Sequence, residues 1–193
     1  MTKLKSEQVE RQAAHTAATL MASSARTAPK GRGVDTIDTL ILDGEDLEAL
    51  ASAMEREAQG KPDYLARVFA RDAGSVRNSI CVLLIGVKGE PKKVEQPFDC
   101  GACGYTSCER LAQARRRRTP EEMTDFPGPN CAFPVLDLGI ALGSAAKVAG
   151  DLNVDNRMMY TIGVPARKLG LLDSDIIIGI PLSVRGKNPY FDR

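Results

Sequence analysis

The chain has 193 residues, 43% of them hydrophobic and 26% charged, a composition typical of one well-cored globular domain. Its 26 basic and 25 acidic residues nearly cancel, so overall charge favours neither nucleic acid nor an anionic membrane surface as a partner. The polar start, MTKLKSEQVERQ, lacks the apolar core of a signal peptide, and we expect no apolar run of membrane-spanning length. The expected compartment is therefore the cytoplasm, where clustered cysteines more often bind metal or do redox chemistry than form disulfides.

The first half of the chain alternates predicted helices with short apolar strands. Its best-defined strand is ICVLLIGV, a fully apolar run of the kind that is buried on both faces of a sheet. Asp43 is placed to cap the helix that follows the first strand, and Pro62 to open the next one. The predicted elements are a helix at 6–25, a loop at 26–35, a strand at 39–43, helices at 44–59 and from 62 onward, and a strand at 80–87.

The second half contains the cysteines and then returns to the same alternation. The predicted elements are a polar connector at 88–99, a cysteine segment at 98–133, a small-residue helix at 134–152, and strands at 157–163 and 176–183. Helices and buried strands lie on both sides of the cysteine segment. The sequence therefore predicts a single α/β or α+β domain over residues 1–193, with an inserted cysteine-rich loop at 98–133.

Four of the five cysteines are spaced C-x2-C-x4-C-x22-C. They are Cys100, Cys103, Cys108 and Cys131. Four thiolates are what a [4Fe–4S] cluster requires. Gly101 and Gly104 allow the backbone between the first three to turn sharply. A helix opening near Pro134 and the arginines that follow Cys108 would add positive charge around an anionic cluster.

A zinc site and disulfide bonds are the two alternatives to a cluster on these cysteines. A structural zinc site also uses four cysteines, but usually as two close pairs, whereas Cys131 stands alone. Disulfides suit neither the expected compartment nor the odd number of cysteines. The spacing favours the iron–sulfur interpretation over both.

The motif CGACGYTSC resembles the first three ligands of the small iron–sulfur domain found in the Rnf electron-transport B subunit and in corrinoid iron–sulfur proteins. In this chain the gap to Cys131 is longer than in those proteins. More of the sequence resembles a prokaryotic family of ferredoxin-domain proteins, through the stretches ARTAPKGRGVD, DCGACGYTSC, GPNCAFPVLDLGIALGSAAK and GIPLSVRGKNPYFDR. This resemblance implies a [4Fe–4S] cluster and leaves the reaction open.

The order of elements around the cysteine segment is similar to that of flavin-dependent nitroreductases. In that family a loop of the form Ala-Pro-Ser lies beside FMN at a dimer interface. Ala28 and Pro29 match this loop, Lys30 replaces its serine, and the family's arginine-rich N-terminal segment is missing. The resemblance implies a nitroreductase-like sheet flanked by helices, a homodimer and a possible FMN site.

If a flavin binds, the candidates for holding its phosphate are Arg26, Lys30, Lys187 and Arg193, because cationic side chains suit that group. The alternative is that the loop at 26–35 merely ends a helix and carries solvated charges. The sequence contains neither a Walker A pattern nor G-x-G-x-x-G, so it gives no support for nucleotide binding through those loops.

For three further features the sequence predicts a structural role rather than a part in a functional site. Cys81, at the start of an apolar strand, is expected to be buried and inert, and His15 to be a surface or packing residue. The run RRRR at 115–118 is expected to be a solvated helix end, with docking of an acidic partner as the alternative. No residue stands out as catalytic.

The sequence therefore predicts a cytoplasmic [4Fe–4S] protein that transfers single electrons, alone or with a redox partner protein. The alternative is an FMN-dependent oxidoreductase in which the cluster passes electrons to the flavin. A third possibility is a cluster with a purely structural role, which holds the inserted loop in place and transfers no electrons.

Overall fold

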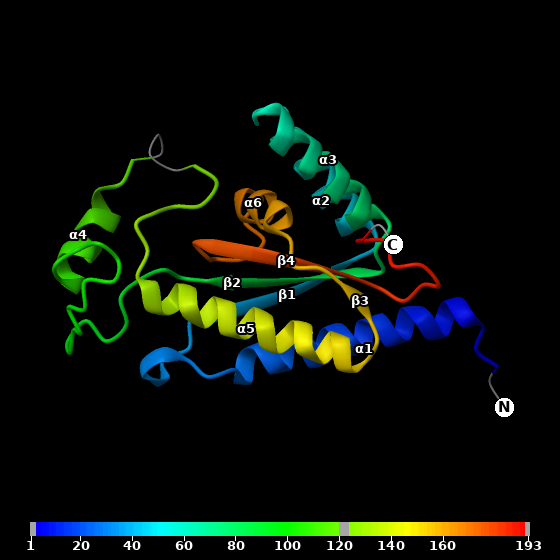
Figure 1. Ribbon diagram of the computed structural model, residues 1–193, viewed down its shortest axis with the longest axis horizontal. Coiled ribbons are helices and arrows are strands. Elements are labelled where there is room, and N and C mark those ends of the chain that lie inside the picture. Colours follow the sequence, from blue (N-terminus) through cyan, green and yellow to red (C-terminus); the bar gives the residue numbers. More distant parts are fainter. Residues whose placement is uncertain (1–2, 120–123, 192–193) are drawn as a thin grey trace.

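The computed structural model describes residues 3–119 and 124–191, and its described elements form a sheet between two layers of helices (Figure 1). The strands are β1 (Ile37–Asp43), β2 (Cys81–Val87), β3 (Asp155–Asn156) and β4 (Ile176–Ser183). The helices are α1 (Ser6–Thr27), the short 3-10 helix η1 (Gly31–Gly33), α2 (Glu45–Ala58), α3 (Asp63–Arg77), α4 (Cys108–Arg117), α5 (Ala132–Asp151) and α6 (Tyr160–Lys168).

The sheet has the order β1-β2-β4-β3, and each neighbouring pair of strands is antiparallel. Strand β2 lies in the middle and is buried along its whole length, as its apolar sequence predicts. Because successive side chains of a strand point to opposite faces, β2 contributes to both layers. Leu83 and Ile85 face the layer of α1 and α5, while Val82 and Leu84 face the layer of α2, α3 and α6.

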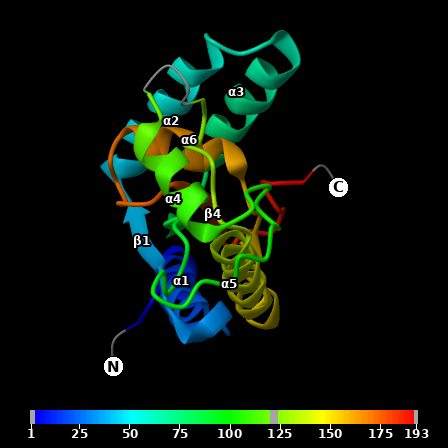
Figure 2. The same ribbon diagram turned by 90° about the vertical axis from the view of Figure 1, so that its left-hand side faces the viewer.

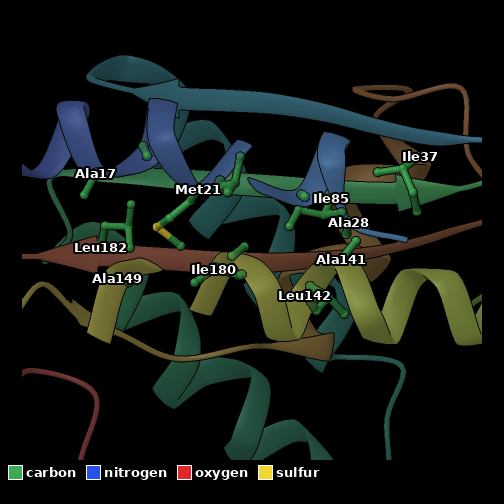
Figure 3. Close-up of a cluster of buried hydrophobic side chains, with 14 of the residues drawn as sticks. Ala17, Met21, Ala28, Ile37, Ile85, Ala141, Leu142, Ala149, Ile180 and Leu182 are labelled. Carbon is green, nitrogen blue, oxygen red and sulfur yellow. The ribbon is translucent and has the colours of Figure 1, made fainter. Parts of the chain in front are cut away.

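Two hydrophobic cores hold the layers to the sheet, and Figure 2 shows the helices divided between its two faces. The first core uses small side chains on the helices. Figure 3 shows Ala17 and Met21 of α1 and Ala141 of α5 packed against the sheet, whose Ile85, Ile180 and Leu182 face them. Alanines at these positions allow α1 and α5 to lie close to the strands and to each other.

Two local predictions are wrong. Residues 157–163 do not form a strand: the chain pairs briefly at β3, and Met159 makes an isolated bridge to Gly179, before α6 begins at Tyr160. Helix α6 lies so close to β4 that a Cβ added to Gly163 would sit 1.6 Å from the carbonyl oxygen of Ile177. Tertiary contact of this kind overrides the strand preference of β-branched residues.

The second wrong prediction concerns the start of α2. Its N-cap is Gly44, with φ of 56°, and no side chain caps the helix. Asp43 instead lies 3.2 Å from His15 and 3.7 Å from Arg11 of α1. His15 is therefore partly exposed, and it has a carboxylate partner that the sequence did not indicate.

Helix α5 begins two residues before the predicted helix at 134–152 and ends one residue before its predicted end. By length and composition it could cross a membrane, with a mean hydropathy of 1.4 over its most apolar window, so the expectation that no such run exists is wrong. In the fold, one side of α5 packs on α1 and the sheet. Its outer side leaves Leu136 and Ile140 exposed.

The segment that connects β2 to α5 lies beyond one end of the sheet. It leaves β2 at Val87, passes through α4 and returns to α5 at Ala132, and Figure 1 shows it at the left of the molecule. In this arrangement Cys131 lies directly before α5, and the other cysteines of the segment precede or begin α4.

Candidate metal centre

The loop that carries the first three cysteines turns at its glycines. Gly101 and Gly104 have φ of 73° and 84°, values that L-residues rarely adopt, and the Gly104 N–H donates to the Gly101 carbonyl at 2.9 Å. These turns confirm the sharp backbone bends that the sequence predicted there. They place Cys100 at the surface and leave Cys103 half-buried.

The third cysteine begins helix α4. Asp99 accepts a hydrogen bond from the Cys108 backbone N–H at 2.7 Å, and the Ser107 hydroxyl accepts one from the Arg110 N–H at 3.2 Å. These two bonds satisfy N–H groups that a helix N-terminus otherwise leaves open. They fix the first turn of α4, and with it the position of Cys108.

Cys131 is the N-cap residue of α5, so the helix starts one residue after it rather than near Pro134. The side chain is 8% exposed. Burial raises the pKa of its thiol, whereas the backbone N–H of Phe133 lowers it by hydrogen bonding, and the three neighbouring cysteines raise it again by charge repulsion. Cys131 is thus close enough to the other three cysteines for their charge to disfavour its thiolate, and a cation at the site would relieve that repulsion.

The four cysteines line one pocket. Phe98 and Phe133 meet edge to face across it, with ring centroids 5.6 Å apart, and the guanidinium of Arg32 lies 4.2 Å from the Phe98 ring centroid. Fully buried Leu111 also lines the pocket. The thiols therefore converge in an apolar setting with a cation at its edge.

A buried ion pair borders this pocket through Lys92. The ammonium of Lys92, whose side chain is 2% exposed, bonds the carboxylate of Asp137 on α5 and donates to the Val34 carbonyl at 2.5 Å. The other carboxylate oxygen of Asp137 accepts from the Gly31 N–H at 2.8 Å. This pair joins the connector, η1 and the first turns of α5, and sequence reasoning missed it because Asp137 showed no partner nearby in the chain.

The arginine run at 115–118 is not a uniformly solvated helix end. Arg116 and Arg117 are exposed, but Arg115 is buried, and both Arg115 and Arg118 bond Asp175. The expectation of a solvated face is therefore wrong for Arg115 and Arg118. Their partner lies 57 or more residues away in the sequence, so no local pattern could have indicated it.

The remaining cysteine lies far from the pocket. Cys81 is fully buried beneath α1, and burial raises the pKa of its thiol to about 12. It stands at the opposite end of β2 from Val87, about 20 Å away at the usual rise of a strand. A separation of this size keeps Cys81 out of any site formed by the other four.

Two kinds of metal group can use four cysteines, a single zinc ion or an iron–sulfur cluster. Within residues 3–119 and 124–191, no three His, Cys, Asp or Glu side chains lie close enough together to hold a single metal ion. Four thiolates on one zinc ion would each lie about 2.3 Å from it. In a four-iron cluster each thiolate binds a different iron, so the sulfurs lie further apart.

Comparison with known proteins places the chain in a family. Residues 127–193 match the family described as "Uncharacterized protein containing a ferredoxin domain (DUF2148)". A protein from Archaeoglobus fulgidus is 50% identical over 177 residues, which cover 92% of this chain and 90% of that protein. The chain belongs to this ferredoxin-domain family.

Solved structures similar to this ferredoxin-domain protein have low sequence identity to it. Bacillus megaterium NfrA1 (TM-score 0.53, 10% identity) is aligned over 93% of this chain and 60% of its own. A BluB-like flavoprotein from Clostridium difficile 630 (0.53, 13%) is aligned over 97% and 84%, and a nitroreductase-like protein from Bacillus cereus (0.51, 9%) over 100% and 81%. These likenesses show that the fold is nitroreductase-like, as the element order predicted.

The residues predicted to hold a flavin phosphate are not brought together in one chain of this ferredoxin-domain protein. Arg26 donates to Asp35 at 2.9 Å and to the Ile37 carbonyl at 2.8 Å, and Lys30 donates to three carbonyls at the end of α1. Both lie at the end of the sheet where β1 begins. Lys187 is exposed beyond the other end, after β4, and Arg193 lies outside the described residues.

Proposed function

We propose that this protein holds a [4Fe–4S] cluster on Cys100, Cys103, Cys108 and Cys131 and exchanges single electrons with a redox partner protein. The observation that carries the proposal is the convergence of four thiols, from a loop, a helix start and a helix N-cap, on one pocket. Segment 98–133 is then a metal-binding insert in a nitroreductase-like domain. The C-x2-C-x4-C-x22-C spacing, which is not the two close pairs usual for structural zinc, supports a cluster over a zinc ion.

Such a cluster, when bound, supplies a one-electron redox centre. The chain's own residues set its surroundings. The Phe133 N–H donates to the Cys131 sulfur, while the guanidinium of Arg32 lies at the pocket, where it offsets negative charge. Leu111 and Phe133 exclude water from the inner side, and Cys100 leaves the outer side exposed to a partner.

A visible spectrum of anaerobically purified protein tests this proposal. We expect a broad absorption shoulder that dithionite bleaches, because iron–thiolate charge transfer disappears on reduction. A colourless protein that contains zinc would contradict it. Reduction of the same sample at stepped potentials would give the redox potential.

A second candidate function is an FMN-dependent oxidoreductase in which the insert passes electrons to a flavin. The flavoprotein among the solved structures with this fold favours it. The arrangement within one chain does not, because Arg26 and Lys30 are already bonded to the loop that carries them and Lys187 lies at the far end of the sheet. Stoichiometric flavin peaks in the same spectrum would favour the oxidoreductase.

We also propose that the protein is a homodimer joined through the outer face of α5. That face exposes the apolar side chains of Val135, Leu136 and Ile140, and an added Cβ at Gly139 or Gly143 would have nothing within 4 Å. A bare apolar helix face is costly in water, and the small residues allow a second helix to approach closely.

Light scattering at micromolar concentration should give twice the mass of one chain. Leu136→Glu combined with Ile140→Glu should give a monomer, because both changes bury charge in the proposed contact. Tyr64→Glu, at an exposed side chain of α3 in the other layer of helices, is the control. A monomer mass for the unmodified protein would contradict the proposal.

A further inference from the structure

One buried guanidinium belongs to a residue that lies between two of the candidate metal ligands in the sequence. Arg115 follows Cys108 by seven residues in α4, which puts both side chains on the same face of the helix, with fully buried Leu111 between them. This face points inward, although the helix ends in a run of four arginines. Arg115 therefore differs from Arg116 and Arg117: its side chain is buried, whereas theirs are exposed.

All three acceptors that Arg115 bonds lie outside its own helix. Its Nη1 donates to the Pro129 carbonyl at 2.8 Å and to Asn130 Oδ1 at 2.7 Å, and its Nη2 donates to Asp175 Oδ2 at 2.7 Å. The side chain is 7% exposed. Charge-assisted bonds of this kind, made by a planar fork in a buried setting, are strong and directional.

The loop that Arg115 holds leads directly to Cys131. The Cys131 N–H donates to the Gly89 carbonyl at 2.8 Å, just beyond the end of β2. The Gly89 N–H in turn donates to Asp175 Oδ2 at 2.8 Å, the oxygen that also accepts from Arg115. We call Arg115, Asn130, Asp175 and Gly89 the Arg115 clamp.

We propose that Arg115 is a positioning residue for the metal centre, because its guanidinium fixes the helix that begins at Cys108 against the loop that ends at Cys131. The inference rests on the proposed iron–sulfur function. Thiols held at a fixed separation bind a cluster without first ordering the chain, so loss of the clamp releases Cys131 and weakens retention of the cluster.

The test uses Arg115→Gln and, as its matched control, Arg117→Gln in the same helical turn. In the reconstituted full chain, Arg115→Gln should lower cluster retention about 10–100-fold, the usual effect of losing a residue that supports metal ligands. Part of the cluster should give the electron paramagnetic resonance signature of a three-iron form, because the Cys131 thiolate is the ligand set free. A loss of stability alone would not produce that signature.

A second experiment, the labelling arm of the test, needs no cluster. In the full chain stripped of metal, mass spectrometry measures how fast iodoacetamide labels each cysteine. Arg115→Gln should label Cys131 about tenfold faster, since charge-assisted bonds that hold its loop are lost. Cys81, buried at the far end of β2, should stay protected and so exclude general unfolding.

Gly89→Ala tests the same clamp without a change of charge. A Cβ at this position would lie 1.9 Å from Asn130 Oδ1 and 2.8 Å from Asn130 Cβ, so Asn130 must move as a whole. We expect the same faster labelling of Cys131. Labelling and cluster retention equal to those of Arg117→Gln in both variants would overturn the proposal. A wild-type chain that binds no cluster would overturn the proposed function, while the labelling arm would still decide on the clamp.

Discussion

Lys92→Met should lower the free energy of unfolding by about 3–5 kcal/mol, because it leaves the Asp137 carboxylate buried without its counter-charge. Both side chains of this pair are at most 3% exposed, so water cannot replace the ammonium. The Val34 carbonyl loses a donor as well. Urea denaturation followed by circular dichroism measures the change.

Two comparisons isolate the buried charge as the cause. Lys147→Met removes an exposed cation paired with Asp151 on α5 and should change stability by less than about 1 kcal/mol. Adding Asp137→Asn to Lys92→Met should recover part of the lost stability, because the amide oxygen still accepts from Gly31 and no charge remains buried. Equal stability of Lys92→Met and Lys147→Met would show that the buried pair is not formed.

Cys131→Ser should cost the protein most of its iron or convert the cluster to a three-iron form. The serine hydroxyl binds iron poorly at neutral pH, and Cys131 is the most buried of the four thiols. The loss of metal affinity should exceed the about 10–100-fold effect of removing a residue that only supports a ligand. Cys100→Ser, Cys103→Ser and Cys108→Ser should act in the same direction, as measured by iron content after reconstitution.

Cys81→Ser is the internal control for these variants. It makes the same sulfur-to-oxygen change at the far end of β2, in a fully buried position away from the pocket. Iron content should equal that of the unmodified protein. An equal loss of iron from Cys81→Ser would refute the assignment of ligands.

The sequence could predict those parts of the fold and of the site that depend on residues close together in the chain. The spacing of Cys100, Cys103 and Cys108 is local, and Gly101 and Gly104 between them have the positive φ that only glycine adopts easily. The apolar run of β2 likewise predicted a central strand buried on both faces. Both depend on short stretches of chain.

The features that sequence reasoning missed depend on residues far apart in the chain. Lys92 and Asp137 are 45 residues apart, and Arg115 and Asp175 are 60 residues apart. Each pair looks like separate surface charges until the fold brings its members together. The wrong prediction of a strand at 157–163 has a similar cause. Gly163 allows α6 to lie against the backbone of Ile177, a contact that only the fold reveals.

The iron and acid-labile sulfide content of the anaerobically purified full chain tests the central claim most directly. A [4Fe–4S] cluster on the four cysteines predicts about four iron and four sulfide per chain, in a protein whose four ligand thiols are protected from alkylation. About one zinc per chain with no labile sulfide would contradict it.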